Sequence, residues 1–123
     1  MVVEGLLMNE ILTDLLAAAP GAKATVFLDN EGESIAHAGD GSIDVRLLGA
    51  WKEIHLDHIK DISNRLGMGN VDAVLFSLDA GNELIAPVGG EYCLLLLLSP
   101  YADLREAMIA LKKAVERLKQ EIA

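Results

Sequence analysis

The 123-residue sequence contains a single cysteine, few basic residues and no apolar run of membrane-spanning length. With only Cys93, the chain has no disulfide framework and no thiolate metal site. Its 10 basic residues against 19 acidic ones give a net charge of −9, which argues against nucleic acid or an anionic membrane as the main partner. The first 16 residues include acidic side chains and lack the basic start of a signal peptide, so we expect a cytoplasmic protein with no membrane insertion.

Motifs of the common enzyme classes are also missing. The sequence has no Gly-x-Ser-x-Gly nucleophile motif, no glycine-rich phosphate loop ending in Lys-Ser/Thr, and no cysteine beside a plausible base. The glycine-rich segments are interpreted as turns. We therefore predict a protein that is not an enzyme, with no catalytic residue and no cofactor.

The longest apolar run, residues 91–100, contains five consecutive leucines. Gly89 and Gly90 precede it and Pro100 ends it. A run bounded by such breakers, and far below the roughly 20 residues of a membrane span, is typical of a strand. Because its residues do not alternate between apolar and polar, both faces must be covered. The run predicts a central strand with helices above and below it.

The other elements are read from their apolar spacing. Helices are expected over residues 6–19, 43–66 and 101–122, and strands over residues 24–29, 33–38, 72–79 and 83–86, with Pro87 ending the fourth strand. The order is helix, two strands, helix, three strands, helix. Both groups of strands are antiparallel, which predicts an α+β fold in a single domain over residues 1–123.

The middle helix and the third strand carry apolar surface that suggests a second copy. The helix has a stripe spanning roughly 140°, wider than one sheet contact requires: Leu47, Leu48, Trp51, Ile54, His55, His58, Ile59, Ile62 and Leu66. It is expected to pack on the sheet and on something beside it. The third strand falls at a sheet edge, is apolar on both faces and has no Lys or Pro to protect it. We predict a homodimer joined through residues 71–78, with these interface residues: Trp51, His55, His58, Ile62, Val74, Leu75 and Phe76.

Two patterns resemble metal sites. His55 and His58 are three residues apart on one helix face, but no cysteine or third histidine is near them in sequence. The alternative is contact with a partner helix or a hydrogen bond within the core. Asp29, Glu31 and Glu33 have the spacing of part of a calcium loop, but its closing bidentate glutamate is absent, so they are interpreted as a turn. No metal site is predicted.

Three stretches in register resemble the Roadblock/dynein light chain domain. They are residues 21–36 (GAKATVFLDNEGESIA, with an Asp-x-x-Gly turn), 66–69 (LGMG) and 87–95 (PVGGEYCLL). The resemblance implies a profilin-like sandwich: a five-stranded antiparallel sheet with one helix on one face and two on the other, in the order α-β-β-α-β-β-β-α. It also implies a homodimer whose third strands join the sheets and whose middle helices lie side by side.

The same resemblance implies a partner. Family members regulate Ras-like GTPases without inserting an arginine, or act as adaptors in signalling or motor complexes, and both roles stay open here. The middle helix is expected to present charges of alternating sign outward, which suit a polar contact with a GTPase or are simply a solvated face. The expected partner-binding residues are Arg46, Lys52, Glu53 and Lys60.

Overall fold

The computed structural model describes residues 2–122, with side chains from Leu7 onward. Its elements, in chain order, are α1 (Val2–Ala18), β1 (Ala22–Asp29), β2 (Ser34–Gly39), α2 (Val45–Arg65), β3 (Val74–Leu78), β4 (Gly81–Val88), β5 (Tyr92–Leu98) and α3 (Leu104–Ile122). The expected element order is confirmed. No helix in this part of the chain is long and apolar enough to cross a membrane.

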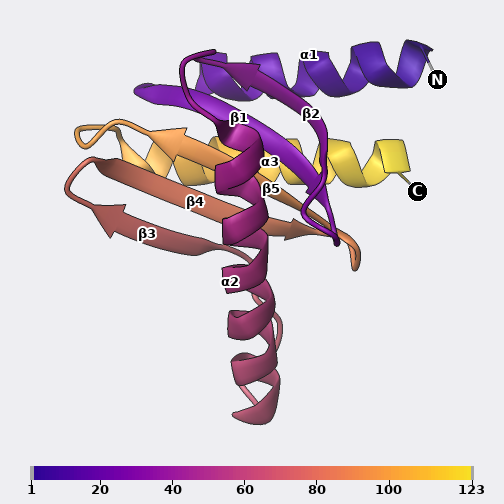
Figure 1. The fold of residues 1–123 in the computed structure, drawn as a ribbon, viewed down its shortest axis with the longest axis vertical. Helices are drawn as coiled ribbons and strands as arrows, with labels where there is room; N and C mark the ends of the chain where they lie inside the picture. Colours follow the sequence, from indigo (N-terminus) through magenta and orange to yellow (C-terminus); the bar gives the residue numbers. More distant parts are fainter. Residues whose placement is uncertain (1, 123) are drawn as a thin grey trace.

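The five strands form one antiparallel sheet in the order β2-β1-β5-β4-β3. The leucine strand β5 is central, between β1 and β4, as predicted. Helices α1 and α3 lie side by side on one face, and α2 crosses the other face (Figure 1). The expected sandwich, with one helix on one face and two on the other, is confirmed.

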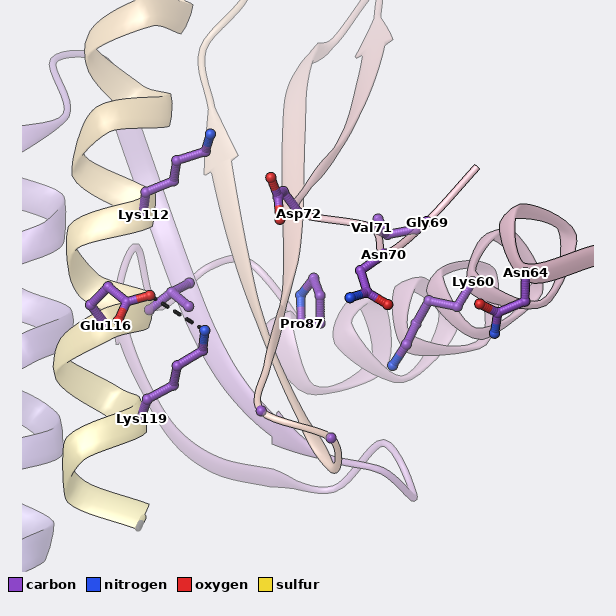
Figure 2. A pocket seen from close by; sticks show the side chains of 13 residues that line it. Lys60, Asn64, Gly69, Asn70, Val71, Asp72, Pro87, Lys112, Glu116 and Lys119 are labelled. Atoms are coloured by element: carbon purple, nitrogen blue, oxygen red, sulfur yellow. Dashed lines mark hydrogen bonds and ion pairs between the residues drawn. The ribbon is translucent and has the colours of Figure 1, made fainter. Parts of the chain in front are cut away.

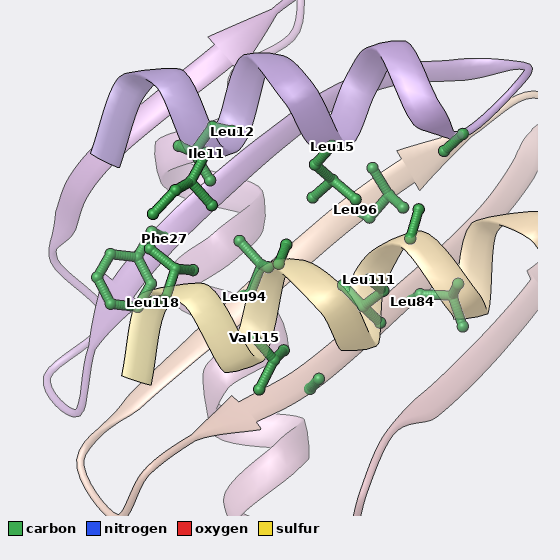
Figure 3. Packing of buried hydrophobic residues seen from close by; sticks show 14 of the residues in the cluster. Ile11, Leu12, Leu15, Phe27, Leu84, Leu94, Leu96, Leu111, Val115 and Leu118 are labelled. Atoms are coloured by element: carbon green, nitrogen blue, oxygen red, sulfur yellow. The ribbon is translucent and has the colours of Figure 1, made fainter. Parts of the chain in front are cut away.

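Two apolar cores explain why the leucine run does not alternate. Leu94, Leu96 and Leu98 point toward α1 and α3, while Leu95 and Leu97 lie in the smaller core under α2. Figure 3 shows Leu94 and Leu96 beneath the α1–α3 pair. Each leucine is at most 7% exposed. The strand therefore needs apolar side chains on both faces, and both helical layers are held to it by burial.

The prediction that Pro87 ends the fourth strand was wrong. Strand β4 continues to Val88, and Pro87 pairs with Cys93 of β5. The first residue of β3, Val74, is opposite Ile85, so no strand of the described chain pairs with β4 on its outer side at Pro87. Proline is tolerated there because an outward-facing edge position needs no N–H donor.

Helix boundaries also differ by a few residues from the expected ones. Helix α2 begins at Val45 rather than residue 43 because the Asp44 carboxylate caps it, accepting the N–H of Leu47 at 3.1 Å. Helix α3 begins at Leu104 rather than residue 101, and Asp103 accepts the N–H of Glu106 in the same way. These caps fix where each helix enters its layer.

Candidate partner-binding surface

The face of helix α2 that contacts the sheet has a glycine near its middle and two charged residues next to it. The residues it buries are Val45, Gly49, Lys52, Glu53 and Leu56. Gly49 permits the close approach, because a Cβ there would lie 2.9 Å from Leu28 Cδ1 and 3.1 Å from Val26 Cγ1. The helix thus sits directly on β1.

Only the first part of α2 lies on the sheet. Its last buried residue is Leu56, and the nine residues from Asp57 to Arg65 continue past the edge strand β3 (Figure 1). At 1.5 Å per residue, this overhang is about 14 Å long. It carries side chains that the sheet of the same chain does not cover.

The wide apolar stripe of α2 packs on the sheet only in part, through Leu48, and most of its other residues are exposed. Leu47, Trp51, Ile54 and Ile62 are between 44% and 59% exposed, and His58 is exposed as well. We call these five residues the apolar flank of α2. The helix turns another face to the sheet because Gly49 fits against Leu28 and Lys52 finds a carboxylate there.

The expectation that Lys52 and Glu53 point outward was also wrong, since they are 9% and 8% exposed. The Lys52 ammonium lies 2.8 Å from Glu83 Oε1 on β4 and 4.1 Å from the ring centroid of Phe76 on β3. This buried oxygen has no well-aligned hydrogen bond in the described chain, so the Lys52 charge is what offsets its desolvation. The pair ties α2 to the two outermost strands on that side.

Glu53 lies in an acidic recess beside the β1–β2 and β4–β5 turns, with Asp29, Asp57, Lys60 and Glu91. Burial raises the pKa of its carboxyl from the ordinary 4.5 to about 7; neighbouring Asp57 and Asp29 add to the rise, and Lys60 opposes it. Glu53 is therefore partly protonated at neutral pH.

Cys93, beside the same recess, is a poor candidate for a nucleophile. Its thiol is buried, and burial, followed by the charges of Glu53 and Asp57, raises its pKa to about 12. The reactive form of cysteine is the thiolate, which this environment disfavours at neutral pH. The position is explained by packing under α2.

The predicted interface residues form a continuous zone without all sharing one face. Trp51, His58 and Ile62 lie on the apolar flank. His55 is exposed beside it, with its ring 5.9 Å from that of Phe76. Val74 and Phe76 pack toward α2, whereas Leu75 is 43% exposed on the other side of β3. The zone thus joins one flank of α2 to the sheet edge.

The predicted partner-binding residues separate into two groups. Arg46 is exposed and Lys60 half-buried on a charged flank that also holds Asp57 and Asp61, about a third of a turn round the helix from the apolar flank. The side chains of Lys52 and Glu53 lie between the helix and the sheet. Across the described residues, no three potential ligands cluster into a metal site. The carboxylate of Asp29 accepts the N–H groups of Glu31 and Glu33, so this segment is a turn, as interpreted.

No model of a known protein family matches the chain, and no curated protein matches it significantly in sequence. Solved structures do match. The Roadblock/LC7 domain from Streptomyces avermitilis has a TM-score of 0.85 at 18% identity, covering 93% of this chain and 96% of that one. An MglB with a tetrameric arrangement has a TM-score of 0.87 at 17% identity, covering 96% and 89%. LokiProfilin2, in complex with rabbit actin, gives 0.59 at 18% identity, covering 92% and 96%.

The chain has a Roadblock-type fold. The likeness to LokiProfilin2 also confirms the profilin-like class of the sandwich. At these identities the likeness establishes the fold, and the role of this Roadblock-type domain depends on its own surface. That surface has two exposed features on α2 and β3: the apolar flank with the free edge, and the charged flank.

A hollow at the N-terminal end of β3 was not predicted from the sequence. It has a volume of about 650 Å³ and lies between α2, the loop before β3, the β4–β5 turn and α3 (Figure 2). Lys60, Lys112 and Lys119 line it. The signal available in the sequence was that five of the ten basic residues lie in the last helix. Only the fold brings Lys60 of α2 to the lysines of α3.

Replacing Glu53 by Gln should stabilise this Roadblock-type domain at pH 8 and have little effect near pH 4.5. A carboxyl whose pKa is raised on folding holds its proton in the native state, so the wild type loses stability as the pH rises from about 4.5 to about 7. Gln imitates the protonated form and avoids this loss, which is on the order of 1–3 kcal/mol. Melting temperatures of both proteins across this range measure it.

The matched control is Glu10→Gln, at an exposed position of α1. Its melting temperature should stay within a few degrees of the wild type, as is usual for a surface substitution. A pH-independent difference for Glu53→Gln would show that Glu53 does not titrate in this way.

Proposed function

We propose that this Roadblock-type domain is a non-catalytic homodimer that regulates a small Ras-like GTPase in the cytoplasm. The observation that carries the proposal is the exposed apolar surface on α2 beside an unpaired sheet edge. Eleven large apolar side chains are exposed among the described residues, and eight of them lie on α2, the loop after it, or β3: Leu47, Trp51, Ile54, Ile62, Leu66, Met68, Leu75 and Leu78. An apolar surface concentrated in this way is typical of a protein interface.

A second copy fits both parts of this surface. Among the described strands, β3 has a neighbour only on its β4 side, so its outer N–H and C=O groups can pair with β3 of a copy in one continuous sheet. The 14 Å overhang of α2 would then extend across the partner's sheet, far enough to cover about three strands at their usual spacing of about 4.8 Å. Val74 and Phe76 would lie under the partner's helix, and the apolar flanks of the two α2 helices would meet.

The charged flank is proposed as the GTPase contact. Arg46 and Lys60 supply positive charge, and Asp57 and Asp61 negative charge, on the side of α2 that the apolar flank leaves free. Lys52 and Glu53 would act indirectly, because they hold α2 on the sheet. The GTPase class comes from the Roadblock resemblance, and a mixed charged surface suits orientation of a partner more than raw affinity.

The second candidate is a dimeric adaptor with no effect on a GTPase, for which the same apolar surface suffices. The two are separated by measuring the affinity of the dimer for the cognate GTPase loaded with GDP or with a non-hydrolysable GTP analogue. A regulator must bind the two states with different affinities, since a partner with equal affinity for both shifts no equilibrium, and we expect the GTP state to be bound more tightly. Equal affinities would leave the adaptor.

The proposed regulator should not supply an arginine to the GTPase. Arg46 and Arg65 are the only arginines outside α3, and Arg65 pairs with Asp61 at 3.0 Å. Single-turnover GTP hydrolysis by the cognate GTPase, with wild-type, Arg46→Ala or Arg65→Ala dimer, should therefore change by less than about tenfold. An arginine finger contributes about 10³–10⁵ in rate, so a loss on that scale in either variant would contradict this mechanism.

A further inference from the structure

The hollow at the N-terminal end of β3 shares Lys60 with the charged flank of α2 and extends from there to the loop before β3, the β4–β5 turn and α3. Figure 2 shows Lys112 and Lys119 reaching from α3, and Lys60 from α2, toward the same space, although the two helices cover opposite faces of the sheet. The space opens because β3 begins opposite Ile85, so no described strand lies outside the last residues of β4.

The rim of the hollow is positive in a chain that is acidic as a whole. The sequence has six lysines and a net charge of −9, and three of the six line this one space. The Lys119 Nζ lies 3.3 Å from Glu116 Oε1, and the two side chains are 46% and 70% exposed. Because the pair is solvated, Glu116 neutralises the charge of Lys119 only weakly. Neither Lys60 nor Lys112 has an ion-pair partner within 4 Å in the described chain, and Asp72 is the other acidic residue on the rim.

The floor of the hollow is apolar and close to bare backbone. Val71, Pro87 and Val115 contribute apolar side chains. Gly69 and Gly90 leave space, since a Cβ at either position would meet nothing within 4 Å. An apolar floor inside a cationic rim is complementary to an apolar side chain flanked by carboxylates.

The geometry also indicates how a ligand would be held. Pro87 has no N–H, so an extended chain cannot pair fully with the free end of β4, and recognition must come mainly from side chains. Lys112 and Lys119 are seven residues apart on α3, or about 10 Å along the helix. Two carboxylates three residues apart on an extended peptide span about the same distance.

We infer that this hollow docks an acidic segment of a partner protein, with an apolar side chain on the Val71–Pro87–Val115 floor and carboxylates at Lys60, Lys112 and Lys119. This goes beyond the proposed function, because Lys112 and Lys119 lie on α3, away from the proposed GTPase and dimer contacts. The segment gives the domain a second attachment point beside the charged flank, with which it shares Lys60.

The test uses the full chain and a fluorescein-labelled synthetic peptide of four Glu-Leu-Ser repeats, in which the glutamates are three residues apart. Binding is followed by anisotropy and by amide NMR shifts. The peptide should bind saturably, weaken on raising salt from 50 mM to 500 mM, and shift the amides of Gly69, Gly89 and Gly90. Lys112→Gln combined with Lys119→Gln should weaken binding about fivefold or more, from two rim charges lost together.

Lys113→Gln is the matched control, since Lys113 is an exposed lysine of α3 outside the hollow. It should change the affinity by less than twofold, and all three proteins should melt alike. The inference is overturned if a peptide with Gln in place of Glu binds equally well, if Lys113→Gln weakens binding as much as the double variant, or if the shifted amides lie elsewhere. It is also overturned if the double variant changes the sedimentation mass, because a second copy would then occupy the hollow. GTPase binding should be unchanged in the double variant. A failure of the acidic-segment inference can therefore be distinguished from a failure of the GTPase proposal.

Discussion

Leu96→Asp should leave the domain unfolded at 25 °C. Leu96 is fully buried on the central strand, beneath the α1–α3 layer (Figure 3), and the one basic side chain that is buried among the described residues, Lys52, lies under α2 on the other face of the sheet. The substitution removes leucine packing worth about 2–5 kcal/mol and buries an unpaired polar group at a cost of several kcal/mol more. A domain of this size has a total stability of roughly 5–15 kcal/mol. Circular dichroism and thermal melting measure the outcome.

Ile109→Asp is the control for this experiment. Ile109 is an apolar residue of similar size on α3, but it is 54% exposed, so Asp there keeps its water. Its melting temperature should stay within a few degrees of the wild type. A wild-type melting curve for Leu96→Asp would contradict the central position of β5 and, with it, the strand order on which every surface described above depends.

Trp51→Glu should convert a dimer into a monomer. At micromolar concentration the wild type should sediment with twice the chain mass of 13.2 kDa, and the variant with the mass of one chain. Trp51 is 58% exposed in the single chain, so its replacement removes little packing within the domain. In the proposed interface it is the largest side chain of the apolar flank, and truncating an interface tryptophan commonly costs 2 kcal/mol or more, about 30-fold in affinity. The buried carboxylate adds to this loss.

The control here is Ile109→Glu, which places the same charge on an exposed apolar residue of the opposite helical layer. It should sediment like the wild type. Both variants should retain the wild-type circular dichroism spectrum, which separates dissociation from unfolding. A wild-type mass of one chain at micromolar concentration would remove the basis for the homodimer.

Local patterns were sufficient to predict the layered fold. The five leucines of β5 required cover on both faces, and the breakers on either side limited the run to a strand. The glycine and proline turns separated the remaining elements, so their order and the antiparallel class followed. Boundaries were less accurate at residues 43 and 101, because the capping carboxylates of Asp44 and Asp103 decide where α2 and α3 begin.

The surface of α2 was predicted only in part. Its periodicity identified an apolar stripe too wide for one contact, and that stripe includes the apolar flank. Periodicity could not show which side of the helix faces the sheet, because that choice depends on residues distant in sequence. The side chain of Leu28 leaves no room for a Cβ at residue 49, where the helix has a glycine, and the carboxylate of Glu83 compensates the buried charge of Lys52.

The sequence by itself thus determined the layers, the central strand and the free edge, since these depend on the local spacing of apolar residues and turns. The tertiary structure alone decided the rotation of α2, the burial of Lys52 and Glu53, and the meeting of Lys60 with Lys112 and Lys119. Each of these is a contact between side chains on different elements, and its free energy depends on distance and burial in space rather than on separation along the chain.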